Sequence, residues 1–123
     1  MPRALILFAH GARDAGWAEP FEKLAGRVRV IAPGHEVRLA FLELMHPDLA
    51  EAAAALVAAG ATAISVVPIF FGQGGHIRRD LPVLIEQLRG RHPGVQIDCA
   101  TPAGEDGGVL DAIAGYCASQ LAS

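Results

Sequence analysis

Apolar residues come in short blocks along the chain, and each block has the length of one secondary-structure element. Residues 3–9 (RALILFA) are almost continuously apolar, which is typical of a strand buried on both faces of a parallel sheet. Residues 36–42 and 62–70 predict a second and a third strand, and 95–99 predict a short fourth one. Pro68 falls near the end of the third strand, where a lost ladder hydrogen bond costs little.

The segments that follow these strands predict helices. In residues 14–30, apolar side chains recur at the spacing of one helix face. These side chains are Trp17, Phe21, Leu24, Ala25 and Val28. Residues 47–59 are rich in alanine, the best helix former, and residues 77–91 and 106–121 predict the last two helices.

Prolines and a glycine mark helix ends. Pro47 suits the first turn of the second helix and Pro82 the first turn of the third, because the missing N–H would be unpaired there in any residue. Gly60 follows the second helix and suits its C-terminal stop.

Strands that alternate with helices predict right-handed crossovers and a parallel sheet. We therefore expect residues 1–123 to form one α/β domain, a three-layer sandwich in which helices cover both faces of a four-stranded parallel sheet of order 2-1-3-4. Ligands of such sheets bind at the carboxyl ends of the strands, where the strand order reverses. The loops after Ala9 and after Phe70 lie at that point.

Composition narrows the classes of protein. With 123 residues, 52% of them hydrophobic, the chain has the length of one domain and can bury a core. The net charge of −3, from 10 basic and 13 acidic residues, argues against a nucleic-acid partner. The absence of a long apolar run argues against a membrane span. The N-terminus is a poor signal peptide, so we expect a cytoplasmic protein, with Cys99 and Cys117 as free thiols in or near the core.

Histidines and a glutamate follow the first three strands. His10 comes directly after the first strand, Glu43 after the second and His76 shortly after the third. On the predicted sheet they share one edge, and His10 and His76 follow adjacent strands. Two imidazoles and a carboxylate suit Fe, Co, Ni and Zn, so we expect a divalent-metal site there.

Each of these residues also has a simpler explanation. A histidine after a strand can cap a turn or bond a backbone carbonyl, and Glu43 can be an ordinary surface residue. The coincidence of His10 and His76 at the predicted switch point favours function. His35, His46 and His92 lie at less informative positions: before a strand, in a loop next to Pro47 and at a helix end, where a cationic ring suits the dipole.

Glycines and arginines surround His76. Gly72, Gly74 and Gly75 precede it, but they match neither the dinucleotide fingerprint nor the Walker pattern. They predict instead a loop that can move, or whose backbone a large flat ligand can approach. Arginines cluster beside the two histidines and suit the binding of carboxylates. They are Arg13, Arg78 and Arg79.

Three stretches together resemble the class II tetrapyrrole chelatases, in their short sirohydrochlorin cobaltochelatase/ferrochelatase form. They are His10-Gly11-Ala12-Arg13-Asp14, then residues 41–47 (FLELMHP), then residues 66–82 (VVPIFFGQGGHIRRDLP). The last is long and specific. The family more often has Ser where this chain has Ala12, and the segment from Val95 onward carries no matching motif.

The resemblance implies insertion of Co²⁺ or Fe²⁺, with Ni²⁺ as a further candidate, into sirohydrochlorin on the route to cobalamin or sirohaem. It implies that His10 and His76 hold the metal, that Glu43 supports them, and that no cofactor beyond the metal substrate is used. It also implies a homodimer in which each subunit resembles half of a longer two-lobed chelatase.

Two other functions remain open on the residues. A metal carrier or sensor would use the same histidines but bind no tetrapyrrole. A phosphate-handling enzyme would use His10 as nucleophile, but Ala9 stands where such enzymes usually have an arginine.

Overall fold

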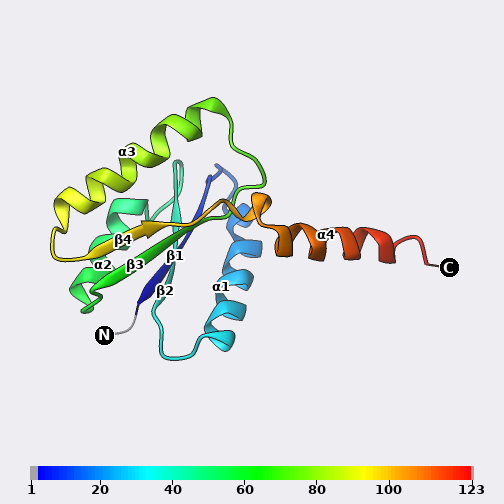
Figure 1. Cartoon of the computed structure of the whole chain (residues 1–123), viewed down its shortest axis with the longest axis horizontal. Coiled ribbons are helices and arrows are strands. Elements are labelled where there is room, and N and C mark those ends of the chain that lie inside the picture. The colour runs from blue at the N-terminus through cyan, green and yellow to red at the C-terminus, as the bar shows by residue number, and fades with distance from the viewer. Residues whose placement is uncertain (1–2, 123) are drawn as a thin grey trace.

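The computed structural model describes residues 3–122, which form a parallel sheet with helices on both sides (Figure 1). The strands are β1 (Ala4–Ala9), β2 (Val37–Phe41), β3 (Ala63–Pro68) and β4 (Gln96–Cys99). The helices are η1 (Ala15–Ala18), α1 (Glu19–Ile31), α2 (Leu49–Ala58), α3 (Gly75–Arg91), η2 (Ala103–Glu105) and α4 (Gly107–Ser119). No helix within residues 3–122 is both long enough and apolar enough to cross a membrane.

The sheet has the predicted order, β2-β1-β3-β4, and every pairing is parallel. Ala9 at the end of β1 pairs with Phe41 at the end of β2, and Phe8 pairs with Pro68 at the end of β3. The loops that follow these three strands therefore leave the same edge of the sheet. This arrangement confirms the predicted fold class and strand order.

The core lies on both faces of β1, one of the two central strands of the sheet. On one face Ile6, Phe8 and Val66 are fully buried among residues of α2 and α3. On the other face Leu7 and Val37 pack with Ala25 of α1. Burial on both faces explains why the strand reads as an unbroken apolar run.

Helix α2 begins two residues later than predicted. Asp48 is its N-cap and forms a capping box with Glu51, each side chain accepting the other's backbone N–H at 2.8 Å. This cap, rather than Pro47, starts the helix, because it satisfies two N–H groups that the first turn leaves free. Gly60 follows the last turn with φ +101°, as expected of a C-terminal stop.

The predictions for two other helices need correction. Pro82 lies inside α3, which begins at Gly75, rather than in its first turn. The first predicted helix is divided: Asp14 caps the short η1, and α1 then starts at Glu19 with a proline in its first turn. A proline donates no hydrogen bond, so it can open a new helix without cost.

Helix α4 forms where the sequence predicts it but does not cover the sheet. It runs on from the carboxyl end of β4 and projects away from the other layers (Figure 1), and all of its residues are exposed. The cysteines also differ from the expectation. Cys99 and Cys117 are free thiols, as predicted, but both are exposed rather than in the core.

Candidate functional site

His10 is held against the core at the end of β1. Its ring lies on the ring of Phe70, with centroids 4.4 Å apart, and Phe70 itself is only 2% exposed. Phe70 in turn packs against Phe8 of β1, with ring centroids 5.8 Å apart. The half-buried imidazole thus stands on a rigid aromatic support, which limits its positions.

Gly11 brings the loop after β2 into contact with His10. It has φ +93°, and a Cβ there would lie 1.9 Å from the carbonyl oxygen of Glu43. The N–H of Glu43 donates to the carbonyl of His10 at 3.1 Å, and that of Leu42 donates to Ala9 at 2.9 Å. Only glycine fits this close approach, so Gly11 places Glu43 beside His10. The sequence reasoning gave Gly11 no role of its own.

The loop that carries Glu43 continues into a histidine–carboxylate pair. The Nδ1–H of His46 donates to Oε1 of Glu51 at 2.7 Å. This hydrogen bond and the carboxylate's charge raise the pKa of His46 above its ordinary value. The backbone N–H of Asp48, and then His46, lower the pKa of Glu51. His46 is a loop residue, as expected, and its ring is tied to the first turn of α2 through Glu51.

His76 lies in the first turn of α3 and is exposed. Its Nε2 is 2.9 Å from Oδ2 of Asp80, one turn further along the helix. A neutral imidazole in this pair donates Nε2–H to the carboxylate, which leaves the Nδ1 lone pair free for a metal. Asp80 lies within the motif of residues 66–82. Its spacing of four residues from His76 is the signal that could have identified it as the partner of that histidine.

The three predicted metal-site residues share one edge of the sheet. Within residues 3–122, however, no three His, Cys, Asp or Glu side chains lie close enough together to hold a metal ion between them. The backbones of His10 and Glu43 are in contact, and His76 lies in the first turn of α3, beyond the loop that follows β3. Joint coordination of a metal by these residues stays a prediction.

The glycine loop before α3 is open on one side and fixed on the other. A Cβ at Gly72, Gly74 or Gly75 would meet no described atom within 4 Å. At Gly104 of η2, in contrast, a Cβ would lie 1.9 Å from the carbonyl oxygen of Phe71. The N–H of Gly104 donates to Phe70 at 2.9 Å. The chain therefore holds the base of the loop and leaves its glycines facing free space.

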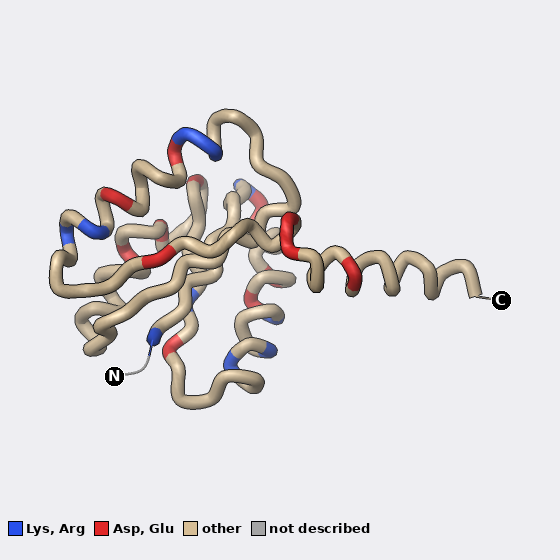
Figure 2. Tube along the Cα trace, in the orientation of Figure 1, with Lys and Arg blue, Asp and Glu red and all other residues tan. Residues whose placement is uncertain are grey.

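The three predicted arginines are all exposed, and none takes part in an ion pair within the described residues. Arg78 and Arg79 form the basic band at the start of α3 in Figure 2. Arg13 lies in the loop after β1, at the same edge of the sheet. Their guanidinium groups are free to bind carboxylates of a ligand.

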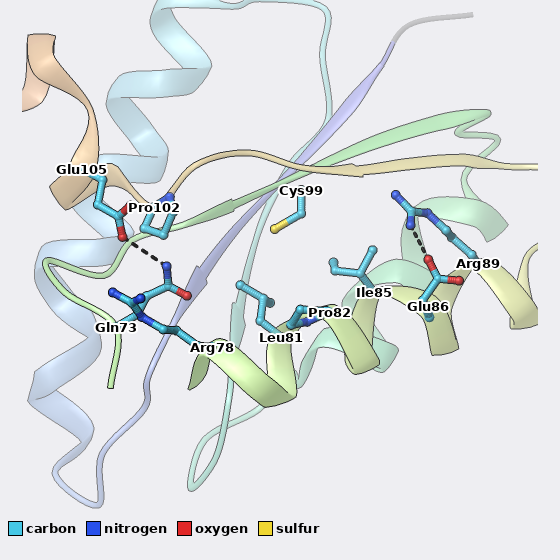
Figure 3. A pocket seen from close by; sticks show the side chains of 10 residues that line it. All are labelled: Gln73, Arg78, Leu81, Pro82, Ile85, Glu86, Arg89, Cys99, Pro102 and Glu105. Atoms are coloured by element: carbon cyan, nitrogen blue, oxygen red, sulfur yellow. Dashed lines mark hydrogen bonds and ion pairs between the residues drawn. The ribbon is translucent and has the colours of Figure 1, made fainter. Parts of the chain in front are cut away.

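A pocket of about 490 Å³ lies beside this edge, between α3 and the segment from β4 to η2 (Figure 3). Arg78 and Gln73 line one end, and Gln73 donates to Glu105 at 3.1 Å. Arg89 and Glu86, which form an ion pair, line the other end. Cys99 is exposed as a residue, but the pocket wall partly desolvates its thiol, and this raises the pKa of the thiol. His10 and His76 do not line this pocket, so it adjoins the predicted site without containing it.

Comparison with known proteins places the chain in a family. The CbiX family model matches residues 4–118. The sirohydrochlorin cobaltochelatase of Sulfolobus acidocaldarius is 35% identical over 107 residues, which are 87% of this chain and 83% of that protein. The sirohydrochlorin ferrochelatase of Bacillus subtilis is 32% identical over 115 residues, 92% of this chain but 43% of the relative.

Solved structures agree with these matches. The crystal structure of a putative cobalamin (vitamin B12) biosynthesis CbiX protein from Marinobacter aquaeolei VT8 has a TM-score of 0.85 to this chain, at 37% identity and 98% coverage of both chains. SirB from Bacillus subtilis with Fe³⁺ has a TM-score of 0.79, at 28% identity, with 94% of this chain matching 46% of SirB. The resemblance noted in the sequence is confirmed: the chain belongs to the CbiX family.

Proposed function

We propose that this protein is a sirohydrochlorin chelatase, which inserts Co²⁺ or Fe²⁺ into the tetrapyrrole. One observation carries the proposal: in a CbiX-family chain, His10, Glu43 and His76 follow three neighbouring strands at one edge of the sheet. The relatives are named as cobaltochelatases or ferrochelatases, and SirB has been solved with Fe³⁺ and with cobalt. The metal is a substrate, and the proposal needs no other cofactor.

The proposed chemistry is an exchange of ligands and protons. The metal must lose water, and the macrocycle must lose two pyrrole N–H protons before its nitrogens can bind. Neutral His10 and His76 hold the ion with open coordination positions and release it to the macrocycle. Glu43 accepts protons or supports the ligands, since its backbone is fixed against His10. Asp80 orients the ring of His76.

The remaining predicted residues suit the macrocycle. Sirohydrochlorin is flat and carries many carboxylates. Gly72, Gly74 and Gly75 face open space, which allows a flat ligand to approach the loop backbone. The unpaired guanidinium groups of Arg13, Arg78 and Arg79 can bind its carboxylates.

We also propose that the active form is a homodimer. The chain matches 46% of the SirB chain, so two copies supply what one longer chain supplies there. The sheet edge of one copy gives the macrocycle one wall, and a second copy gives the other. We place the enzyme in the cytoplasm, where two exposed, unpaired cysteines remain reduced.

The test is anaerobic incubation of the protein with sirohydrochlorin and either Co²⁺, Fe²⁺ or Ni²⁺, followed by absorption spectroscopy against a protein-free control. The proposal predicts acceleration with Co²⁺ or Fe²⁺, and the relative rates rank the candidate metals. Metal binding by folded protein without acceleration for any ion would overturn the proposal and indicate a metal carrier.

A further inference from the structure

Two consecutive residues of η2 contact the two sides of the candidate site. The N–H of Gly104 donates to the carbonyl of Phe70 at 2.9 Å, and the ring of Phe70 supports the ring of His10. Next along the chain, Oε2 of Glu105 accepts a hydrogen bond from the Nε2–H of Gln73 at 3.1 Å. Gln73 lies in the glycine loop that leads into α3. The short η2 therefore holds both the support of the first predicted metal ligand and the loop before the second.

The backbone of η2 is itself attached to the sheet. The N–H of Ala100, just after β4, donates to the carbonyl of Val66 in β3 at 2.8 Å. Pro102 is buried, and its carbonyl accepts the N–H of Glu105 at 2.9 Å. The carboxylate of Glu105 therefore extends from a backbone whose position the sheet determines.

The glycine loop has few other restraints. Gln73 is half-buried, whereas the other five residues from 71 to 76 are exposed. Gly72 and Gly74 flank it, and they have wide conformational freedom because no described atom would meet a Cβ there within 4 Å. Among residues 3–122, no other hydrogen bond joins residues 71–74 to the sheet or to η2. We call the hydrogen bond between Gln73 and Glu105 the latch.

The latch also determines which groups of the loop stay free. Gln73, Arg78 and Glu105 lie together at one end of the pocket in Figure 3. Glu105 forms no ion pair with Arg78 within the described residues and bonds the neutral amide instead. An ionised carboxylate only accepts hydrogen bonds, so the amide must turn its NH₂ group toward it. The latch thus fixes the Gln73 amide and leaves the Arg78 guanidinium available to a ligand.

We propose that Glu105 is a positioning residue for the proposed chelatase reaction. Through the latch it holds the glycine loop, and with it the first turn of α3 that carries His76. The aromatic support already restrains His10, but the exposed His76 depends on the loop for its position. Ordering a free loop when the metal binds costs conformational entropy, and the latch supplies part of that order beforehand.

This inference rests on the proposed function and adds to it a residue from the segment after β4. That segment carries no motif of the family in the sequence. The latch makes its start part of the active site, because the loop before α3 needs a fixed acceptor on the neighbouring strand's extension. Nothing in residue spacing indicates that contact, since Gln73 and Glu105 are 32 positions apart.

The first test compares two substitutions of Glu105. A hydrogen bond to a charged group changes an equilibrium about 10-fold at the lower end of its measured range, which suits an exposed pair. Glu105→Ala is therefore expected to lower kcat/KM for Co²⁺ insertion about 10-fold. Glu105→Gln keeps an acceptor oxygen and is expected to retain most of the wild-type value. A wild-type value in Glu105→Ala, or an equal loss in both variants, would overturn the proposal.

A matched control and a double variant show whether Glu105 acts through Gln73. Glu86→Ala removes the same charge from the other end of the pocket, where Glu86 pairs with Arg89, and is expected to keep the wild-type rate. Gln73→Ala, Glu105→Ala and the double variant are expected to lose the same factor, because each breaks the same hydrogen bond. Losses that multiply in the double variant would contradict the latch.

Amide hydrogen exchange tests the latch without any assay of activity. The N–H of Arg78 donates to the carbonyl of Gly74 at 3.1 Å, so its exchange reports whether the loop is held. Exchange in residues 72–82 is expected to be faster in Glu105→Ala than in wild type, Glu105→Gln or Glu86→Ala. Unchanged exchange in Glu105→Ala would overturn the proposal. If exchange responds as expected but wild-type protein accelerates no metal insertion, the latch stands and the proposed function fails.

Discussion

Helices α2 and α4 are alike in sequence and opposite in environment. Both are rich in alanine, and both start at an aspartate whose side chain accepts a backbone N–H of the first turn, at 2.8 Å for Asp48 and 3.1 Å for Asp106. Yet α2 buries Leu49, Leu56 and two alanines against the sheet, whereas α4 buries none of its residues.

The difference teaches that local signals specify a helix without specifying where it packs. Capping and alanine content act within the helix itself. Packing depends on which surface lies within reach. For α2 that surface is the chain's own sheet, whereas α4 finds no such surface within the described residues. The candidate site shows a similar contrast: the chain holds some groups in place and leaves others exposed.

The largest expected effect is a loss of folding stability when a charge is placed in α2 rather than in α4. Ala53 of α2 is fully buried, so Ala53→Asp would place an unpaired charge in the core, at a cost of several kcal/mol. Ala118 of α4 is exposed, and Ala118→Asp is expected to leave the melting temperature within a few degrees of wild type. Thermal denaturation followed by circular dichroism compares them; a normally folded Ala53→Asp variant would contradict the structure.

The next largest expected effect on stability distinguishes Gly11, which lies against another segment of backbone, from glycines such as Gly74 that have no close neighbours. Gly11→Ala forces an alanine to a positive φ and against the carbonyl of Glu43, which costs about 1–3 kcal/mol from the backbone conformation alone. Gly74→Ala meets no neighbouring atom and is expected to keep wild-type stability while slowing metal insertion. Urea denaturation together with the insertion assay measures both. Equal losses of stability would show that the glycine loop is not open.

A smaller effect concerns the orientation of His76. Asp80→Asn keeps the side-chain shape but removes the charge that holds the imidazole N–H. The rate of metal insertion is expected to fall about 10- to 100-fold, as for other partners of metal-binding histidines. Asp111→Asn, which removes a charge from α4, serves as control. An unchanged rate in Asp80→Asn would mean that the pair does not position His76.

The smallest effect concerns the pair at the start of α2, which has no counterpart at the start of α4. His46 has a pKa raised above 6.5 and Glu51 a pKa lowered below 4.5. The pair therefore contributes most to folding stability between pH 4.5 and 6.5, the two ordinary pKa values. The contribution of His46 is lost as the pH rises through its raised pKa, and that of Glu51 is lost as the pH falls through its lowered pKa. Glu51→Gln should return the His46 pKa toward 6.5, measured by NMR titration; no change would contradict the pairing.

Much of the fold could be predicted because it depends on patterns within short segments. Apolar runs located the strands, and their alternation with helices gave the parallel order 2-1-3-4. Helix starts were less certain, since Pro82 is tolerated inside α3 and the capping box of Asp48 competes with Pro47 as a start signal. The exposed position of α4 could not be predicted, because its apolar residues would suit any apolar surface, whether in this chain or in another molecule.

The site was predictable in outline for the same reason. Strand order alone placed His10, Glu43 and His76 at one edge. The contact of Gly11 with Glu43, the support of His10 by Phe70 and the pairing of His76 with Asp80 depend on three-dimensional positions that residue spacing only partly encodes. Sequence reasoning therefore named the groups that we propose to carry the chemistry, and it missed most of the contacts that hold them in place.

We propose above all that His10 and His76 carry metal insertion at this edge of the sheet. The most direct test is the anaerobic rate of Co²⁺ insertion into sirohydrochlorin by His10→Ala and His76→Ala, each checked for wild-type circular dichroism and dimer mass. Both variants are expected to fall to the rate of the protein-free reaction. A folded, dimeric variant of either histidine that keeps the wild-type rate would contradict it.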